Sequence, residues 1–557
     1  MGAITMAKRR RAIVLAGVSV YAGLLAFSGP AANASPAGTA AKQSRATAIV
    51  PAGNLAQIVG TGSSWAYYAI AQWIANVHQS GVQVVYTPTG SAAGRQDFGL
   101  ATTDFGVSDI GYQGYDPVTQ TNDTSTRHYA YLPITGGGTA FPYNIVVGGH
   151  RITNLRLSGK TLAEIFTNHI TNWDAQAITN DNNGRKLPSM PIITVVPSEG
   201  SGTTAMFTRY LNFLFRSLWQ PFNNGKPGMT EYWPRQGSSQ VAQNGSTQIM
   251  NYVSSPNANG AIGFAEYAYA LASHFPVVNL ENAAGYYVLP SEYNDAVALT
   301  QAQINYNPAS KDYLLQNLNR VYTFNDPRAY PLASYSYTIM PTANSDPRMA
   351  VPSGQFPAKW QTLAKFLSYS ICQGQTYIGP IGYSALPLNL VEAGFKQIDK
   401  IKAAAPKVSL GQLNVHNCHN PTFVFGHPSA NHLAQIAPQP PTCDKTGHGP
   451  CSGVLNANAN HGRGSGPSPS PSPSSSPGAS MPPGGSSPGP VVPVTGPTIT
   501  GPVAGPAPTA VPITLTSGQD PGLSKGLLGA LVLLLLLGAL VLPPLLYRRW
   551  SSRGGQP

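Results

Sequence analysis

Charged residues are scarce in this chain of 557 residues, where Asp, Glu, Lys and Arg together make up 10%. The formal net charge is nevertheless +12. Residues 8–11 carry four of the positive charges and residues 525–553 carry four more, so the central part has no basic stripe. Nucleic-acid binding needs clustered cationic contacts with phosphates. The charge distribution therefore argues against a nucleic-acid partner.

Cysteine is also rare, with four residues in the whole chain. In an exported protein an even number favours disulfides. We expect Cys443 to pair with Cys451 and Cys372 with Cys418, although four cysteines allow three pairings. A zinc site around His416, Cys418 and His419 is an alternative, but the spacing matches no familiar ligand pattern. We expect neither a metal nor a cofactor.

The two ends of the chain carry apolar stretches. The basic residues 8–11, the apolar residues 12–27 and the small residues 32–34 are typical of a signal peptide cut after Ala34, with an uncleaved anchor as the alternative. Residues 526–547 contain no charge and are long enough to cross a bilayer as one helix. Two arginines follow, which predicts a cytoplasmic tail at residues 548–557. We therefore expect the body on the extracellular face of the cell membrane.

A low-complexity tract precedes the predicted membrane helix. Residues 464–520 are dominated by Pro, Gly, Ser and Thr, and Asp520 is their single charged residue. This composition predicts a disordered linker. At about 3.1 Å per residue it could span up to roughly 170 Å, enough to clear a thick cell wall, unless it is a passive tether. Residues 402–463, with three of the cysteines, form a Cys/His-containing extension between body and linker.

The body, residues 46–401, alternates short β-rich runs with amphipathic helical patterns. This alternation predicts an α/β fold with largely parallel sheets. Its length is too great for one such lobe and suits two. The clearest predicted strands are residues 82–86, 143–147 and 192–196, and the clearest helices are residues 64–77, 161–166 and 203–215.

Two glycine-bearing turns carry the chemistry. The segments 60–65 and 200–204, GTGSSW and GSGTT, each lead into a predicted helix. Glycine lets the backbone approach a ligand closely, and the free N–H groups of a first helical turn attract an anion. Two such turns can hold one oxyanion without a lysine. The alternative is that both are ordinary capped helix starts.

Asp109, in the segment DFGVSD, is the third element. A carboxylate suits an anion site when the ligand itself carries a proton, because it accepts a hydrogen bond from protonated phosphate. Sulfate has no proton to give, and an unpaired buried acceptor is costly. The predicted ligand is therefore phosphate, although a turn-capping role for Asp109 is the alternative.

These residues resemble the substrate-binding proteins of phosphate ABC transporters over roughly residues 50–400. The resemblance implies a two-lobed, type II periplasmic-binding-protein-like fold that closes on its ligand by hinge motion. Its discontinuous first lobe would comprise residues 46–135 and 330–400, and its second lobe residues 136–329. The resemblance also implies the ligand-binding residues Ser64, Trp65, Ser91, Asp109, Ser201, Gly202 and Thr203. The blocks that carry it are residues 60–65, 89–91, 104–109, 157–174, 200–204, 260–269, 335–340 and 381–387.

The sequence departs from the family pattern at Pro197, where the family usually has an arginine that contacts the anion. Glu199, at the place of the acidic residue that normally restrains this arginine, remains. A lost charge-assisted hydrogen bond costs about 1.5–3 kcal/mol. Arg95 is a candidate compensating cation, or else a solvated helix residue. The family's Gram-positive members are usually lipoproteins, in contrast to the C-terminal helix predicted here.

We expect an extracellular, monomeric receptor that captures inorganic phosphate, or a related tetrahedral oxyanion, for an ABC transporter permease and is not an enzyme. The alternative is a wall-spanning surface protein with a degenerate fold that no longer binds phosphate. A phosphatase is a third hypothesis. It lacks support because the sequence shows no metal-ligand cluster and no base near Ser201.

Overall fold

A computed structural model describes residues 55–116, 118–411 and 413–451. All of them fall in the first of the two units into which the chain divides. The predicted signal peptide, linker, membrane helix and cytoplasmic tail lie outside the described residues. Within those residues, no helix is both long and apolar enough to cross a membrane.

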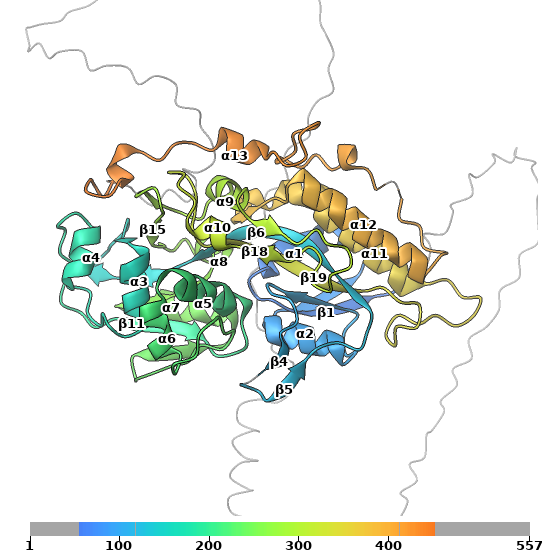
Figure 1. Ribbon diagram of the computed structural model, residues 1–557, viewed down its shortest axis with the longest axis horizontal. Coiled ribbons are helices and arrows are strands. Elements are labelled where there is room, and N and C mark those ends of the chain that lie inside the picture. Colours follow the sequence, from blue (N-terminus) through green and yellow to red (C-terminus); the bar gives the residue numbers. More distant parts are fainter. Residues whose placement is uncertain (1–54, 117, 412, 452–557) are drawn as a thin grey trace, which may run out of the picture. The chain divides into compact units, whose positions relative to one another are not determined.

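The first lobe is built on a seven-stranded sheet that draws on both ends of the body (Figure 1). Its order is β14-β6-β19-β3-β1-β2, with β20 paired to β6. The strands are β1 (Ile58–Gly62), β2 (Val84–Thr87), β3 (Phe105–Ser108), β6 (Tyr129–Ala140), β14 (Ala265–Glu266), β19 (Ala333–Pro341) and β20 (Tyr383–Ser384). The helices with them are α1 (Tyr67–His78), α2 (Ser91–Gly99), α9 (Glu292–Leu299), α11 (Ala358–Ile371) and α12 (Leu388–Ala404).

The second lobe is built from the middle of the chain around a four-stranded sheet of order β12-β11-β13-β7. Its strands are β7 (Tyr143–Asn144), β11 (Ile193–Pro197), β12 (Gln240–Gln243) and β13 (Ala261–Gly263). A smaller sheet joins β10 (Arg156–Leu157), β15 (Asn279–Glu281) and β16 (Tyr287–Val288). The helices are α3 (Gly159–Phe166), α4 (Gln176–Asp181), α5 (Gly202–Leu214), α6 (Arg216–Phe222), α7 (Gly245–Ser254), α8 (Tyr267–Ala272) and α10 (Asn319–Tyr322). Short two-stranded ribbons complete the described part: β4 (Gly114–Asp116) with β5 (Thr121–Asp123), β8 (Val146–Val147) with β9 (His150–Arg151), and β17 (Gln303–Ile304) with β18 (Gln316–Asn317).

The prediction of largely parallel sheets is correct only in part. β1 pairs in parallel with β2 and β3, and β11 with β12 and β13. The long strands β6 and β19, in contrast, pair with each other antiparallel. β6 leads at Ala140 almost directly into β7 of the second sheet, so it links the two lobes. Both strands are buried along nearly their whole length, which explains their continuous apolar and small-residue sequences.

Large aromatic side chains fill the cores. In the first lobe Trp65, Trp73 and Trp360 are each 1% exposed. In the second lobe the rings of Phe166, Phe207 and Trp233 pack with centroids 5.2–5.8 Å apart. Burial of each such ring contributes more than any other apolar side chain to the folded state.

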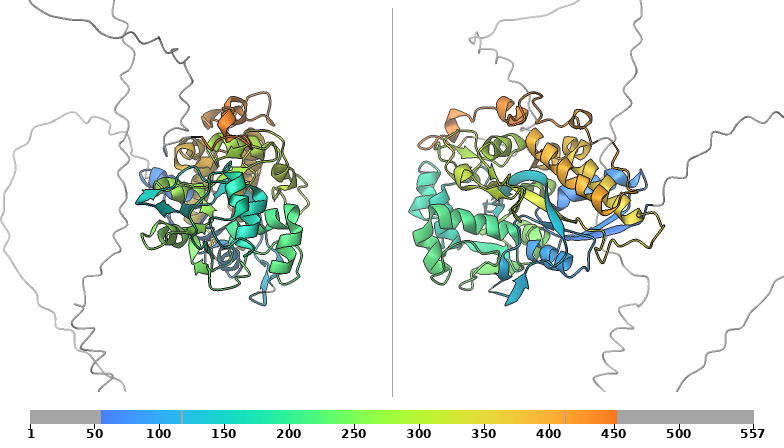
Figure 2. Two further views of the ribbon diagram at one scale, coloured as in Figure 1. Left: turned by 90° about the vertical axis from the view of Figure 1, so that its left-hand side faces the viewer. Right: turned by 45° about the vertical axis from the view of Figure 1, so that its right-hand side comes forward.

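The extension after α12 lies against both lobes, and the views of Figure 2 show it in orange along one edge of the body. Its helix α13 (His432–Ile436) packs on α9. Further along the extension, the carbonyl groups of Lys445 and His448 accept from the guanidinium of Arg156, which belongs to the second lobe. The extension therefore contacts both lobes.

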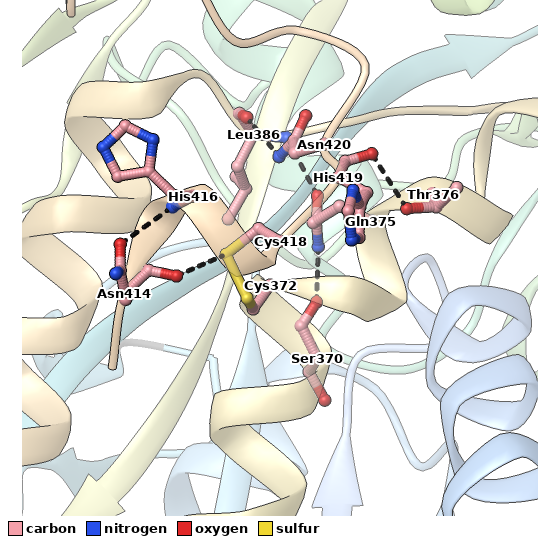
Figure 3. Close-up of a disulfide and its surroundings, with 10 residues drawn as sticks. All are labelled: Ser370, Cys372, Gln375, Thr376, Leu386, Asn414, His416, Cys418, His419 and Asn420. Carbon is pink, nitrogen blue, oxygen red and sulfur yellow. Dashed lines mark hydrogen bonds between the residues drawn. A yellow bond between two sulfur atoms is a disulfide. The ribbon is translucent and has the colours of Figure 1, made fainter. Parts of the chain in front are cut away.

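Two disulfides hold the extension, and the predicted pairing is confirmed. Cys372–Cys418 ties it to the end of α11, as Figure 3 shows, and Cys443–Cys451 closes a short loop near the second lobe. Around the first bridge, Asn420 donates from its amide to the carbonyl of Leu386 at 2.9 Å. Because Cys418 is bonded to Cys372, its sulfur is not available to a metal. No group of three or more potential metal-ligating side chains occurs in residues 55–451 as described.

Candidate functional site

Asp109 follows directly after β3 and is 2% exposed. β1 and β3 are parallel, with Gly62 opposite Val107, so their carboxyl ends meet at one edge of the sheet. Ser63, the residue after β1, therefore lies beside Asp109. Its hydroxyl donates to the carboxylate at 2.8 Å to Oδ1 and 2.9 Å to Oδ2.

Two further hydroxyl groups donate to the same carboxylate. Ser91, the first residue of α2, contacts Oδ2 at 3.1 Å, and Ser336 of β19 contacts Oδ1 at 2.6 Å. Three separate segments of the first lobe thus converge on the one buried carboxylate of a fourth. Burial raises the pKa of Asp109, while the hydrogen bonds from Ser336, Ser63 and Ser91 act to lower it.

The N-terminus of α5 faces this cluster from the second lobe. Ser201 caps the helix by accepting from the N–H of Thr204 at 3.4 Å. Gly202 has no space for a side chain, because a Cβ there would collide with the Asp109 carboxylate and lie 2.5 Å from Oγ of Ser91. Thr203, beside it, is 2% exposed. The predicted residues Ser91, Asp109 and Gly202 are therefore brought together, with Ser201 and Thr203 flanking the glycine.

Hydrogen bonds cross the cleft on both sides of this contact. The N–H of Ala92 donates to the carbonyl of Gly200 at 3.0 Å. The hydroxyl of Ser64 lies 3.2 Å from that of Ser246, at the start of α7, and accepts from the Ser246 N–H at 3.3 Å. The structure therefore represents a closed arrangement of the lobes.

Ser64 and Trp65 lie in the turn before α1, which begins at Tyr67 and not at Ser64 as the sequence predicted. Ser63 instead turns the chain, since its N–H donates to Val107 and its hydroxyl accepts from Ala66. The Trp65 ring packs edge-on against Tyr383 in the core, with centroids 5.8 Å apart. Its indole is therefore structural, and only its backbone lies near the cleft turn.

Arg95 is not a solvated helix residue, so that alternative is wrong, and as a candidate compensating cation it is already ion-paired. It is fully buried, and its Nε lies 2.9 Å from Oδ2 of Asp123. Its Nη2 pairs with Glu231 of the second lobe at 2.5 Å, and Nη1 donates to Ser108. Because both partners are buried carboxylates, Arg95 is neutralised where it stands and joins the two lobes.

Pro197 itself brings no cation to this end of β11. Pro197 is buried in β11 opposite Gln243. Glu199 accepts from the N–H of Gly245 at 3.0 Å, while its Oε1 has no partner among the described residues. Burial raises the pKa of Glu199. This carboxyl group therefore braces the start of α7 instead of restraining an arginine.

Sequence reasoning missed Ser63, Ser246, Ser336 and Glu231. Ser246 carried a usable signal, because the segment NGST repeats the glycine-and-hydroxyl pattern of the other two turns. Ser336 lies in one of the blocks that carry the family resemblance, but the sequence assigned it no role. Glu231 had no local signal, since only the folded chain brings it to Arg95.

The facing strand ends of two lobes define a two-lobed binding protein. A family model described as a PBP superfamily domain matches residues 35–373. The phosphate-binding protein PstS of Xylella fastidiosa (strain Temecula1) is 29% identical over 337 residues, 60% of this chain and 83% of the relative. PstS of Pasteurella multocida (strain Pm70) is 34% identical over 250 residues, 44% of this chain and 67% of the relative.

The chain therefore belongs to the PBP superfamily and, within it, to the PstS family. PstS 3 of Mycobacterium tuberculosis is 27% identical over 349 residues, 62% of this chain and 87% of the relative. A solved structure of a periplasmic phosphate-binding protein bound with phosphate (PfluDING) aligns with a TM-score of 0.46 at 18% identity, over 65% of this chain and 98% of its own.

Proposed function

We propose that this protein captures inorganic phosphate outside the cell and delivers it to an ABC transporter permease. The observation that carries the proposal is the Asp109 carboxylate, bound by three serine hydroxyls and faced by the N-terminus of α5. Hydroxyls and backbone N–H groups serve as donors to phosphate oxygens, and the carboxylate serves as acceptor for a phosphate proton. Relatives named phosphate-binding protein PstS support the same ligand.

The site residues follow from this proposal. Ser64, the Trp65 backbone, Ser91 and Asp109 bind phosphate from the first lobe. Ser201, Gly202 and Thr203 bind it from the second. We add Ser63 and Ser336, because their hydroxyls already contact the carboxylate. Opening of the lobes would expose these groups, and closure would exchange hydroxyl–carboxylate contacts for contacts with the anion.

We also propose that the body stays attached to the membrane. Residues 526–547 would form the anchor and residues 464–520 the spacer, after removal of residues 1–34. The uncharged apolar stretch and the two arginines that follow it support this arrangement. A receptor held in this way would act as a monomer near its permease.

Isothermal titration calorimetry with phosphate tests the proposed function. The parent should bind phosphate and not sulfate, whereas Gly202→Ala should lose phosphate binding because the added methyl collides with Asp109 in the closed form. Gly225→Asn is the matched control, since Gly225 has positive φ and open space around it. Absence of binding by the folded parent would favour the alternative surface protein with a degenerate site.

A further inference from the structure

A cavity of about 250 Å³ adjoins Asp109. Its first wall is the segment from Asp109 to Gln113 together with Tyr337 of β19. Arg209 of α5 lines it from the second lobe, together with Asp312, Leu315 and Gln316. The cavity thus touches the candidate site through Asp109 and the second lobe through Arg209.

The geometry of α5 directs Arg209 towards the candidate site. Gly202 and Arg209 are seven residues apart, which is about two helical turns, so they lie on the same face about 10 Å apart along the axis. Gly202 is in contact with Asp109 and Ser91. Long side chains on a helix lean towards its N-terminus. Arg209 therefore lies on the face of α5 that Gly202 presents to Asp109, and it lines the same cavity as Asp109.

Arg209 has unused hydrogen-bonding capacity. Its one hydrogen bond to a described residue runs from Nη2 to Sδ of Met229 at 3.2 Å, and it has no ion pair among those residues. Arg95 and Arg127, by contrast, are both paired with buried carboxylates. A half-buried guanidinium with free donors beside a cavity is a suitable group for an anion.

Tyr337 provides a second unsatisfied group in the same cavity. It is 1% exposed, and its hydroxyl has no hydrogen-bond partner in the described part of the chain. Burial and then Tyr335 raise the pKa of Tyr337, Arg209 and a weak contact with the backbone of Gln316 act to lower it, and Asp109 acts to raise it. Arg209 and Asp109 are thus both within electrostatic reach of this hydroxyl.

An anion that approaches Asp109 meets two negative charges in this cavity, Asp109 itself and Asp312. Gln113 and Gln316 are neutral, and among the described residues that line the cavity Arg209 is the one cation. Without Arg209 the lining would repel an oxyanion. Arg95 also acts to lower the pKa of Asp109, but it is already paired with Asp123 and Glu231, whereas Arg209 has no ion pair among the described residues.

We infer that Arg209 is the affinity-determining cation of the cleft, which attracts the oxyanion and holds it against Asp109, with Tyr337 as an added donor. The inference rests on the proposed function and extends it to a residue two turns along α5. The negative charge of Asp312 partly offsets the positive charge of Arg209, and so weakens the attraction between Arg209 and the anion.

Calorimetric titration of the full chain with inorganic phosphate, at low and at high NaCl concentration, tests this inference. Arg209→Gln should weaken binding about tenfold at low salt, the equivalent of one charge-assisted contact. It should also reduce the salt dependence. Asp312→Asn should tighten binding about threefold and provides an independent arm if Arg209→Gln does not fold.

The matched control is Arg216→Gln, an exposed arginine at the start of α6 whose side chain bonds only Gln220 among the described residues. It should bind phosphate as the parent does. Equal affinity of Arg209→Gln and the parent, or no gain with Asp312→Asn, would overturn the inference alone. A parent that binds no phosphate would overturn the proposed function together with it.

Discussion

The hydroxyl group of Ser336 lies 2.6 Å from Oδ1 of Asp109, although 227 positions separate the two residues in the sequence. The pairing of β19 with β3 explains this contact, because Tyr337 stands opposite Ser108. The register of β19 with β6 shifts between Ser336 and Tyr337, and such irregularities re-aim side chains. The setting of Asp109 therefore depends on the correct register of a strand from the C-terminal half of the body.

Asp109→Asn should change the choice between phosphate and sulfate. The amide replaces an acceptor oxygen with an N–H donor, so a protonated phosphate oxygen loses its partner while sulfate gains one. We expect the preference for phosphate to fall by about tenfold or more, as measured by calorimetric titration with both anions. Ser336→Ala removes one hydroxyl but keeps the carboxylate, and should retain the preference. An unchanged ratio of affinities in Asp109→Asn would contradict the proposed role.

Glu231→Gln should loosen the closed arrangement. Arg95 would keep Asp123 in its own lobe but lose its charged partner in the second lobe. We expect weaker phosphate binding and a larger radius of gyration in small-angle X-ray scattering with phosphate present. Asp123→Asn is the matched control, because it breaks the pair within the first lobe and leaves the bond across the cleft. Both variants should lose about 1.5–3 kcal/mol of stability. Equal scattering curves for the two variants would therefore contradict the idea that the Arg95–Glu231 pair holds the lobes closed.

Asp295→Asn should change how stability depends on pH. Asp295 is fully buried, and neither of its carboxyl oxygens has a partner in the described residues. Burial raises its pKa well above the usual range. Glu266, Tyr267 and Tyr330 are the titratable groups with which it interacts.

A carboxyl group with a raised pKa in the folded state stabilises the fold below its ordinary pKa of about 4, and this contribution is lost as pH rises through the raised value. The parent should therefore lose stability from pH 5 to pH 8 more steeply than Asp295→Asn. At pH 8 the variant should be more stable by more than about 1.4 kcal/mol, the equivalent of one pKa unit. Urea unfolding at both pH values measures this. Asp399→Asn, on the exposed side of α12, should follow the parent.

Removal of the two disulfides should have unequal effects. Cys372–Cys418 spans 46 positions and Cys443–Cys451 spans 8. Loop-closure entropy predicts a loss of about 4 kcal/mol for Cys372→Ser with Cys418→Ser, and about 2.5 kcal/mol for the other pair. Denaturant unfolding of both double variants measures the difference. A greater loss from the shorter loop would show that packing of the loop dominates over chain entropy.

The sequence predicted the parts of the site that depend on local pattern. Asp109 and Ser91 follow strands whose parallel pairing brings their ends together, and Gly202 begins a helix whose cap was visible as Ser201. The cysteine pairing could be predicted because Cys443 and Cys451 are near each other in the chain, which leaves Cys372 for Cys418.

Other parts could not be predicted because they depend on tertiary placement. Whether Ser63 or Ser64 contacts Asp109 is decided by the turn after β1, and two adjacent serines carry no signal for that choice. The burial of Arg95 depends on Glu231, 136 positions away. The antiparallel β6 and β19 read as buried apolar runs, and burial on both faces conceals the direction of a strand.

The position of Cys451 has a mechanical consequence. Asn154 of the second lobe donates to its carbonyl, and Asn183 donates to that of Gly449. Any pull on the residues that follow is therefore carried first by the second lobe and by the loop that Cys443–Cys451 closes. If that attachment peels away, residues 419–442 can lengthen until the load reaches Cys418 and its covalent link to α11. The first lobe would then carry the load. The second lobe, no longer held by the extension, would become the lobe that is free to rotate.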